Sequence, residues 1–235
     1  REIPKSLIKV HNKPMIDYAI DILKILEITN IYINVHYKSE ILKEYIEYKK
    51  KPNLKISDES DELLDTGGAI KKIFVDHSIE NALVLNSDVI WREKHIKSFR
   101  EMISRFNSKS TAILGIIKSN QHNGYTGKGD FCIDKNNLLS RYNNLEGDPY
   151  NYIGSQIISR EAFKSVNSHI FSINLVWDEL ITRKELEESV AKVFDAILTG
   201  KVKIDISKKY KLSDVQQAHR DLENRNLTGP AVIIP

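Results

Sequence analysis

Apolar residues in the first half of the chain recur with two different spacings. Where they return every three or four positions they are typical of amphipathic helices, and this spacing predicts helices over residues 13–28, 38–50, 67–74 and 93–106. Short apolar runs rich in β-branched residues lie between them, and these predict strands over residues 31–35, 54–57, 82–86 and 111–117. Strands that alternate with helices predict an α/β fold with a parallel sheet covered on both faces.

The pattern changes after residue 127. Apolar runs now follow one another with only Asp, Asn and Gly turns between them, which is typical of antiparallel strands. The expected strands are 129–134, 138–142 and 152–159. We expect them to extend one edge of the sheet, and a helix to follow over 171–181.

A second change in pattern comes at Thr182. The stretch TRKE, residues 182–185, has the form of a capping box, in which Thr and Glu side chains satisfy amides at a helix start. The apolar stripe behind it predicts a helix over 183–198. We therefore place two domains, 1–181 and 182–235.

The tail after this helix contains three further expected elements. They are a strand over 202–206, a capped helix from Ser213 and a closing strand over 231–234. We expect a small α/β tail.

Composition narrows the class of protein. The chain has 235 residues, of which 41% are hydrophobic and 29% charged, which fits a folded protein with a hydrophobic core. A net charge of only +3, with scattered basic residues, argues against nucleic acid as a partner. The single cysteine, Cys132, fits a reducing compartment, so we expect the cytoplasm. No apolar run approaches the roughly 20 residues of a membrane span.

Two stretches follow expected strands at the end where parallel sheets bind ligands. Asn86 ends the strand 82–86 and Asp88 follows it closely, where a carboxylate can hold Mg²⁺. The alternative is that Asp88 caps a turn or helix. His36, which follows the strand 31–35, either borders the same crevice or has a structural or solvated role.

The stretch LLDTGGAI, residues 63–70, places two glycines at an expected helix start. Asp65 or Thr66 can cap the helix, while Gly67 and Gly68 let a ligand approach backbone amides at its positive end. The alternative is an ordinary capped turn. Lys5, beside Pro4, is either a phosphate contact or a surface lysine.

Four stretches, in order, resemble motifs of the sugar-1-phosphate nucleotidyltransferases. They are IPKSLIKVHNKPMIDYAID, LLDTGGAIKKI, ALVLNSDVIW and YNYIGSQIISREAF. The resemblance covers roughly residues 1–181 and points to the mannose-1-phosphate guanylyltransferase or N-acetylmuramate-1-phosphate uridylyltransferase type. It implies a Rossmann-like nucleotide-diphospho-sugar transferase sheet. It also implies a reaction in which a nucleoside triphosphate and a sugar 1-phosphate form a nucleotide sugar and pyrophosphate with Mg²⁺.

The resemblance assigns roles to particular residues. Lys5 matches the lysine that contacts phosphate, and Asp88 the first metal-binding aspartate. Substrate-binding positions are matched by Thr66, Gly67, Gly68, Asn86, Tyr152 and Gly154.

Parts of the family pattern are not found in this sequence. The family opens with a strand and a glycine- and arginine-rich loop that wraps the triphosphate, and it carries a second metal aspartate downstream. We therefore expect an incomplete sheet in which the strands 31–35 and 82–86 lose a partner or pair differently, and we doubt that turnover survives. Asp178 matches no such motif and is interpreted as a surface carboxylate.

Residues 182–235 resemble the C-terminus of quinone oxidoreductases of the medium-chain alcohol dehydrogenase type. The match includes AHRDLE, followed by TG and an apolar ending. The chain has no G-x-G-x-x-G segment after a strand, so no NADPH is expected. In that family this tail packs on the catalytic domain, for which this chain shows no match. We therefore expect the apolar stripe of helix 183–198 to dock on the first domain, to dimerise or to aggregate.

Three functions stay open at this point. The first is a sugar-1-phosphate nucleotidyltransferase, whose nucleotide and sugar the sequence does not identify. The second is a non-catalytic module that keeps part of the nucleotide or sugar pocket. The third is a quinone oxidoreductase fragment.

Overall fold

The computed structural model of the chain describes residues 3–50, 53–122, 127–143, 147–190, 208–211 and 231–234, with the single positions 214, 217 and 221. The chain forms two compact units, Arg1–Val193 and Phe194–Pro235. Each unit is described by itself below.

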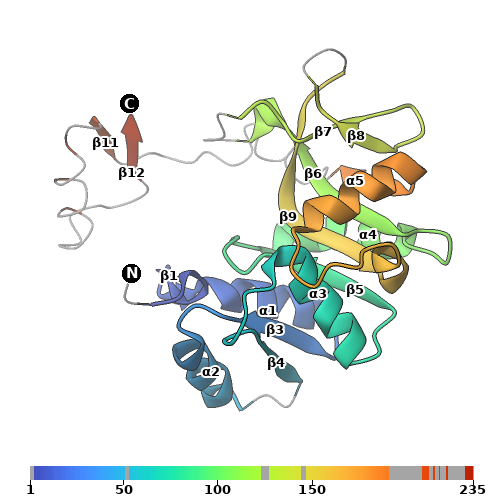
Figure 1. Ribbon diagram of the computed structural model, residues 1–235. Helices are drawn as coiled ribbons and strands as arrows, with labels where there is room; N and C mark the ends of the chain where they lie inside the picture. Colours follow the sequence, from blue (N-terminus) through green and yellow to red (C-terminus); the bar gives the residue numbers. More distant parts are fainter. Residues whose placement is uncertain are drawn as a thin grey trace. The chain divides into compact units, whose positions relative to one another are not determined.

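The first unit begins with a pair of parallel strands and two helices (Figure 1). Strand β3 (Ile31–Val35) pairs in register with β4 (Leu54–Asp58). Helices α1 (Met15–Ile25) and α2 (Ser39–Tyr48) contribute Ile16, Leu42 and other buried side chains to one apolar cluster with β3. Two very short strands, β1 (Lys9–Val10) and β2 (Lys13–Pro14), precede α1. The helices and strands predicted here from apolar spacing are confirmed.

The main sheet of the first unit is mixed. Its strand order is β10-β6-β9-β7-β8, and β5 also pairs with β9. The bounds are β5 Asn81–Leu85, β6 Ala112–Lys118, β7 Phe131–Ile133, β8 Leu139–Arg141, β9 Tyr150–Ser159 and β10 Leu186–Val190. Because β6 and β9 are almost wholly buried, they form the centre of the unit.

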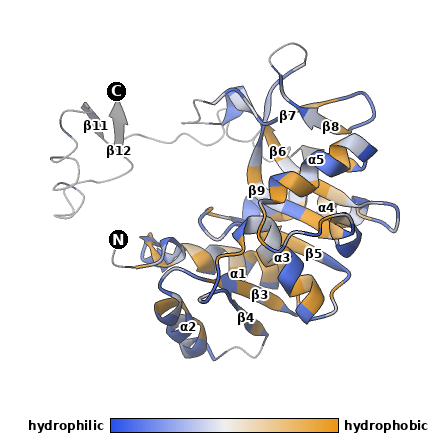
Figure 2. Ribbon diagram, in the orientation of Figure 1, coloured by the Kyte–Doolittle hydropathy of each residue, from blue (hydrophilic) through white to orange (hydrophobic). Residues whose placement is uncertain are grey.

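Helices cover both faces of this sheet. Successive residues of β6 point to opposite sides, as a strand requires: Leu114 packs with α3 (Asp65–Asp76) and α5 (Ile173–Arg183). Ile113 packs instead with α1 and α4 (Ile96–Arg105). Figure 2 shows hydrophobic and hydrophilic residues alternating along these helices, as expected where one side is buried. The expected α/β layers are therefore present.

The strands on either side of the predicted gap have single partners. Within the described residues β3 pairs only with β4, and β5 pairs only with β9, in antiparallel register. Strands β3 and β5 thus belong to separate sheets. Leu83 of β5 packs against two apolar clusters, one that includes α2 and one that includes helix 96–105, although its own side chain stays partly exposed.

The antiparallel strands only partly extend the edge of the sheet. β7 and β8 lie at the edge as predicted, but β9 runs between β5 and β6. Its run of apolar residues, Ile157 and Ile158 included, is suited to burial on both faces. Sequence order alone could not reveal this insertion.

The predicted helix over residues 183–198 is wrong where the structure describes it. Residues 186–190 form strand β10, which pairs in parallel with β6, and residues 191–198 lie outside the described part. Lys184 ends α5 in the left-handed conformation. Glu185 accepts a hydrogen bond from the Thr111 hydroxyl instead of completing a capping box. Since Leu186 is buried, the expected exposed helical stripe does not exist there.

The second unit is described at few positions. Strand β11 (Lys208–Lys211) pairs in parallel with β12 (Ala231–Ile234). The closing strand over 231–234 is thereby confirmed, whereas the predicted strand over 202–206 and the cap at Ser213 lie outside the described residues. Tyr210 and Gln217 both donate hydrogen bonds to the buried Asp221 carboxylate.

The helices that the structure describes have at most 12 residues. Over the described part of the chain, none combines the length and the apolar character needed to cross a membrane.

Candidate functional site

Strand β5 ends beside a bulged part of β9. The Asn86 amide donates to the Gly154 carbonyl at 2.8 Å. Gly154 has a φ of +84°, and a Cβ placed on it would come within 3.0 Å of the Asn86 Cβ. Both the positive φ and the close approach of Asn86 therefore require glycine at position 154. The two predicted residues, Asn86 and Gly154, are in contact.

Asp88 lies in the exposed turn after Asn86. The Asn86 carbonyl accepts a hydrogen bond from the Trp91 indole at 3.0 Å, which fixes the start of this turn on a buried ring. The carboxylate of Asp88 is therefore accessible at the carboxyl end of β5. This position suits either a metal ion or a solvated turn.

The glycine pair of α3 lies under the segment that leads into α5. The amides of Gly67 and Gly68 both donate to the Phe171 carbonyl, at 2.9 and 3.1 Å. A Cβ on Gly67 would lie 2.4 Å from the Phe171 ring, and one on Gly68 would lie 2.4 Å from the His169 carbonyl. Close approach of residues 169–171 therefore explains both glycines, and these two amides already have an acceptor.

Two further bonds complete the contact between the same segments. The Thr66 hydroxyl accepts the Ile173 amide at 3.0 Å, and the Phe171 amide donates to the Leu64 carbonyl at 3.2 Å. Thr66 thus caps the beginning of α5 and not its own helix. Its hydroxyl hydrogen is still able to donate, because the bond to Ile173 uses only a lone pair.

Tyr152 lies on the side of the sheet that α5 covers. Its ring packs edge-on against Trp177 with centroids 4.8 Å apart, and its amide donates to Asp130 at 2.9 Å. Burial raises the pKa of the Tyr152 phenol, so the hydroxyl stays protonated. It can serve as a hydrogen-bond donor but not as a base at neutral pH.

The predicted residues fall into groups. Asn86, Asp88 and Gly154 gather at the end of β5, whereas Thr66, Gly67 and Gly68 gather at the start of α3 after β4. Lys5 is exposed in the short helix η1 (Lys5–Leu7). The first two groups follow the carboxyl ends of β5 and β4, where α/β sheets bind ligands, whereas Lys5 precedes the first strand.

One buried carboxylate was missed by sequence reasoning. Glu59 directly follows β4 and is only 4% exposed, and its Oε1 has no hydrogen-bond partner within the described residues. Burial raises the pKa of Glu59, while the Leu64 amide, the Asn34 side chain and the nearby charges of Lys72 and His36 oppose that rise. The acidic pair Asp58 and Glu59 after the predicted strand 54–57 was the available signal.

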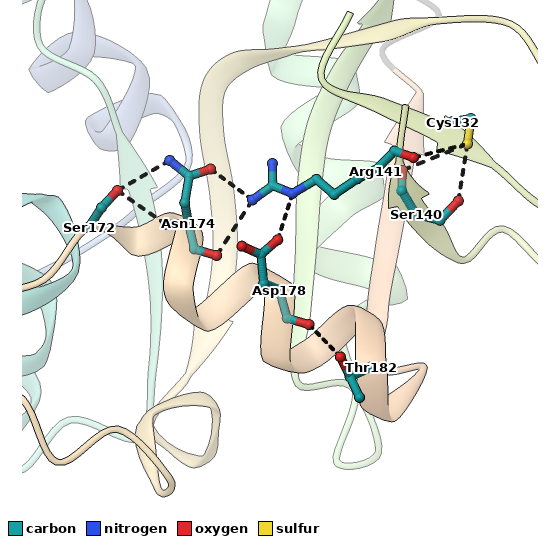
Figure 3. Close-up of polar contacts among 7 residues, drawn as sticks. All are labelled: Cys132, Ser140, Arg141, Ser172, Asn174, Asp178 and Thr182. Carbon is teal, nitrogen blue, oxygen red and sulfur yellow. Dashed lines mark hydrogen bonds and ion pairs between the residues drawn. The ribbon is translucent and has the colours of Figure 1, made fainter. Parts of the chain in front are cut away.

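Asp178 has a structural partner, as its interpretation as a surface carboxylate suggests. Figure 3 shows the Arg141 guanidinium between Asp178 and Asn174 of α5. Arg141 Nε donates to Asp178 Oδ1 at 2.7 Å, and Arg141 Nη2 donates to Asn174 Oδ1 at 2.8 Å. The guanidinium also lies 4.8 Å above the Phe131 ring, so it joins β7, β8 and α5.

No ready-made cluster of metal ligands exists in the described part of the chain. The described residues contain no group of three or more His, Cys, Asp or Glu side chains that could hold a metal ion. At the candidate site, Asp88 could supply one carboxylate. One carboxylate is sufficient for Mg²⁺ that takes most of its other ligands from phosphate oxygens and water.

Comparison with known proteins identifies two families. The model of the family "Nucleotidyl transferase" matches residues 1–129, which is more than half of the chain. The model of the family "Zinc-binding dehydrogenase" matches residues 141–233. The second match begins inside the first compact unit, so it overlaps strands of the mixed sheet.

Curated relatives of the first part share a quarter to a third of its residues. N-acetylmuramate alpha-1-phosphate uridylyltransferase of Caulobacter vibrioides is 25% identical over 182 residues, 75% of each chain. Mannose-1-phosphate guanyltransferase of Hypocrea jecorina is 30% identical over 160 residues, 66% of this chain and 42% of that protein. The chain therefore spans three quarters of the first relative and less than half of the second.

Solved structures share the fold at low sequence identity. HddC from Yersinia pseudotuberculosis complexed with GMP-PN superposes with a TM-score of 0.63 at 19% identity, covering 82% of this chain and 83% of that one. The inositol-1-phosphate CTP transferase from T. maritima gives a TM-score of 0.64 at 12% identity, covering 80% and 77%. At these identities the likeness shows the Rossmann-like fold alone.

The tail has a different relative. Quinone oxidoreductase 1 of Escherichia coli is 40% identical over 58 residues, which is 24% of this chain and 18% of that protein. This match supports the fusion of two sequence sources that the motifs indicate. The chain thus belongs to the nucleotidyl transferase family, with sugar-1-phosphate nucleotidyltransferases among its relatives, and carries a quinone oxidoreductase-like tail.

Proposed function

We propose that the chain acts on a nucleoside triphosphate and a sugar 1-phosphate at the carboxyl ends of β4 and β5. In this reaction a phosphate oxygen of the sugar phosphate attacks the α-phosphorus of the triphosphate. The bond from that phosphorus to the bridging oxygen of the β-phosphate breaks, and pyrophosphate leaves. The observation that carries the proposal is the contact of Asn86 with Gly154 at the end of β5. The exposed Asp88 follows Asn86 by two residues, and the chain belongs to the nucleotidyl transferase family.

Asp88 is the residue that we assign to Mg²⁺. Its exposed carboxylate fits a cation that takes most of its remaining ligands from phosphate and water. Bound Mg²⁺ would neutralise charge on the phosphate oxygens. Lys5 supplies a further cation to phosphate, and Tyr152 and Gly154 border the sugar.

The start of α3 is assigned to positioning and not to a free phosphate cradle. Because Phe171 already accepts the amides of Gly67 and Gly68, those amides hold the entry to α5 in place. Thr66 keeps its hydroxyl hydrogen for a substrate oxygen. This arrangement also favours the second candidate, a module that binds nucleotide or sugar without turnover.

A pyrophosphate-release assay tests the proposal. The full chain is incubated with MgCl₂ and either GTP with mannose 1-phosphate or UTP with N-acetylmuramate α-1-phosphate, the pairs that the names of the relatives suggest. We expect release with one pair, and a loss of at least about 100-fold in Asp88→Asn. Asp178→Asn is the matched control and should keep its rate, because Asp178 binds Arg141.

Other outcomes of this assay distinguish the alternatives. Nucleotide binding without pyrophosphate release would support the non-catalytic module. Oxidation of NADPH by a quinone would instead support the oxidoreductase, and we expect none.

Two further assignments rest on sequence alone. We propose that the family boundary lies between residues 181 and 182, as the extents of the motifs indicate. We also propose a cytoplasmic location, which the single cysteine favours and which fractionation of the source cells would test.

A further inference from the structure

A hollow of about 1000 Å³ opens in the first unit where β5 and β6 begin and β9 ends. Asn81, the first residue of β5, lines it, whereas Asn86 and Asp88 follow the last residue of the same strand. Five strand residues span roughly 17 Å. The hollow is therefore separate from the candidate nucleotide site, and its size is at the upper end of the range for small-molecule pockets.

Positive charge is concentrated at this hollow. More cations than carboxylates line it: Lys71, Lys109, Arg160 and Lys164 against Glu80 and Glu161. The excess of two positive charges is a large part of the net charge of +3 carried by the whole chain. Clefts lined by one sign of charge attract ligands of the opposite sign.

The cations are held only weakly by their protein partners. Arg160 Nη1 lies 3.7 Å from Glu80 Oε1, and both side chains are about half exposed or more. Lys164 pairs with Glu161 at the surface, and Lys71 donates to the Val166 carbonyl and not to a carboxylate. Since exposed ion pairs contribute little to stability, Arg160 and Lys164 can turn to an anion at little cost.

One hydroxyl of the hollow is buried without a partner. Ser110 and Thr111 donate to Glu187 and Glu185 of the neighbouring β10 segment, at 3.1 and 3.2 Å. Ser159 is only 8% exposed, and its Oγ has no hydrogen-bond partner within the described residues. A buried hydroxyl without a hydrogen bond carries a free-energy cost. A ligand oxygen beside Ser159 and Arg160 would remove this cost.

Apolar side chains also line the hollow. Aromatic and aliphatic side chains contribute to it, among them Phe74, Val75, Phe106, Phe163 and Val166. Val75 is 56% exposed, so an apolar ligand surface placed there would be shielded from water together with it. The hollow therefore offers both a charged and an apolar part.

We propose that this hollow binds a small phosphorylated molecule with an aromatic or apolar body. Lys109, Arg160 and the Ser159 hydroxyl take the phosphate, and the wall around Val75 and Phe106 takes the body. Helix α3 lines the hollow through Lys71 and Val75 and carries Thr66 at its other end. The binding itself does not depend on the proposed nucleotidyltransferase activity.

Titration of the full chain with 1-naphthyl phosphate tests this site. We expect saturable binding by calorimetry and binding at least ten-fold weaker for neutral 1-naphthol. The double variant Lys109→Gln/Arg160→Gln should bind the phosphate at least ten-fold more weakly, and Ser159→Ala about five-fold more weakly. The control Lys97→Gln/Arg100→Gln removes the same charge from the exposed side of α4 and should stay within two-fold.

Several results would overturn the proposal. They are no binding at millimolar probe, equal binding of 1-naphthol, full displacement by GTP with Mg²⁺, or unchanged binding in the double variant. If the double variant does not fold, amide chemical shifts of the unsubstituted chain decide the matter. Shifts centred on residues 106–111 and 158–161 support the site, and shifts centred on 64–68 and 86–88 contradict it.

Discussion

Single residues at the start of α3 determine how closely two segments approach. Gly68 has the His169 carbonyl 2.4 Å from the place where a Cβ would lie. A helical glycine replaced by alanine normally gains about 0.5–1 kcal/mol of stability. Here the added methyl group must move backbone, so the expected sign is reversed.

Gly68→Ala is therefore predicted to lower the free energy of unfolding by roughly 1–3 kcal/mol. Chemical denaturation monitored by circular dichroism measures this change. A gain in stability would show that residues 169–171 do not lie over α3. The exposed helical substitution Ser104→Ala is the control and should change stability by less than about 0.5 kcal/mol.

His95 gives the fold a pH dependence. The ring is 8% exposed, and its Nδ1 accepts the Arg92 amide at 2.9 Å. Burial, helped by the nearby charge of Lys94, lowers the pKa of His95 to about 4, from 6.5 for the free side chain. The unfolded chain therefore binds more protons between these two values, and stability falls as the pH drops through that window.

We expect the loss from pH 6.5 to pH 4 to reach about 2–3 kcal/mol from His95 alone. The midpoint of thermal unfolding measured across this range, for the unsubstituted chain and for His95→Gln, isolates the contribution. The variant should be less stable at pH 7 and flatter in its pH profile. Equal slopes in the two proteins would mean that His95 is accessible to protons in the folded state.

The sequence predicted part of the candidate site and missed another part for a physical reason. Asn86 and Asp88 could be named because polar residues follow a strand there, and Gly154 because its stretch resembles a family motif. The burial of Glu59, only 4% exposed, could not be foreseen, because a carboxylate after a strand is usually solvated and the contact with Asn34 of β3 comes from the fold. Nor could the motif reveal that Phe171 accepts the amides of the glycine pair.

At the scale of elements, the local apolar pattern predicted the correct element wherever tertiary packing favoured the same structure. Strands β3 to β6 and helices α1 to α5 follow the apolar spacing. Strand β10 does not, because β6 presents an edge of backbone donors and acceptors that only an extended segment can satisfy. At residues 186–190, backbone pairing with β6 therefore outweighs the helical preference of the 183–198 stretch.

Leu186 tests the assignment of β10. It is 1% exposed in the sheet core, so Leu186→Ala should lower the free energy of unfolding by about 2–4 kcal/mol. Leu175→Ala on α5 is the matched control, because its side chain is 46% exposed, and it should change stability by less than about 1 kcal/mol. Denaturant unfolding compares the two. Similar small effects would contradict the strand.

At the scale of the whole molecule, two sequence sources meet within one chain. The first compact unit carries the nucleotidyl transferase fold and continues to Val193, beyond the motifs of that family. Strand β10, which follows the boundary that we propose between residues 181 and 182, pairs with the edge of β6 in the mixed sheet. The two sources are thus joined by backbone pairing as well as by the peptide chain.

The most direct test of the nucleotide site is thermal unfolding of the full chain in MgCl₂, with and without GTP or UTP. A ligand at 100 times its dissociation constant stabilises the folded state by about 2.7 kcal/mol. For a unit of this size we expect the midpoint to rise by roughly 5–10 °C with one of the two nucleotides, and by much less in Asp88→Asn. A cooperative transition that neither nucleotide moves would contradict a nucleotide site at the ends of β4 and β5.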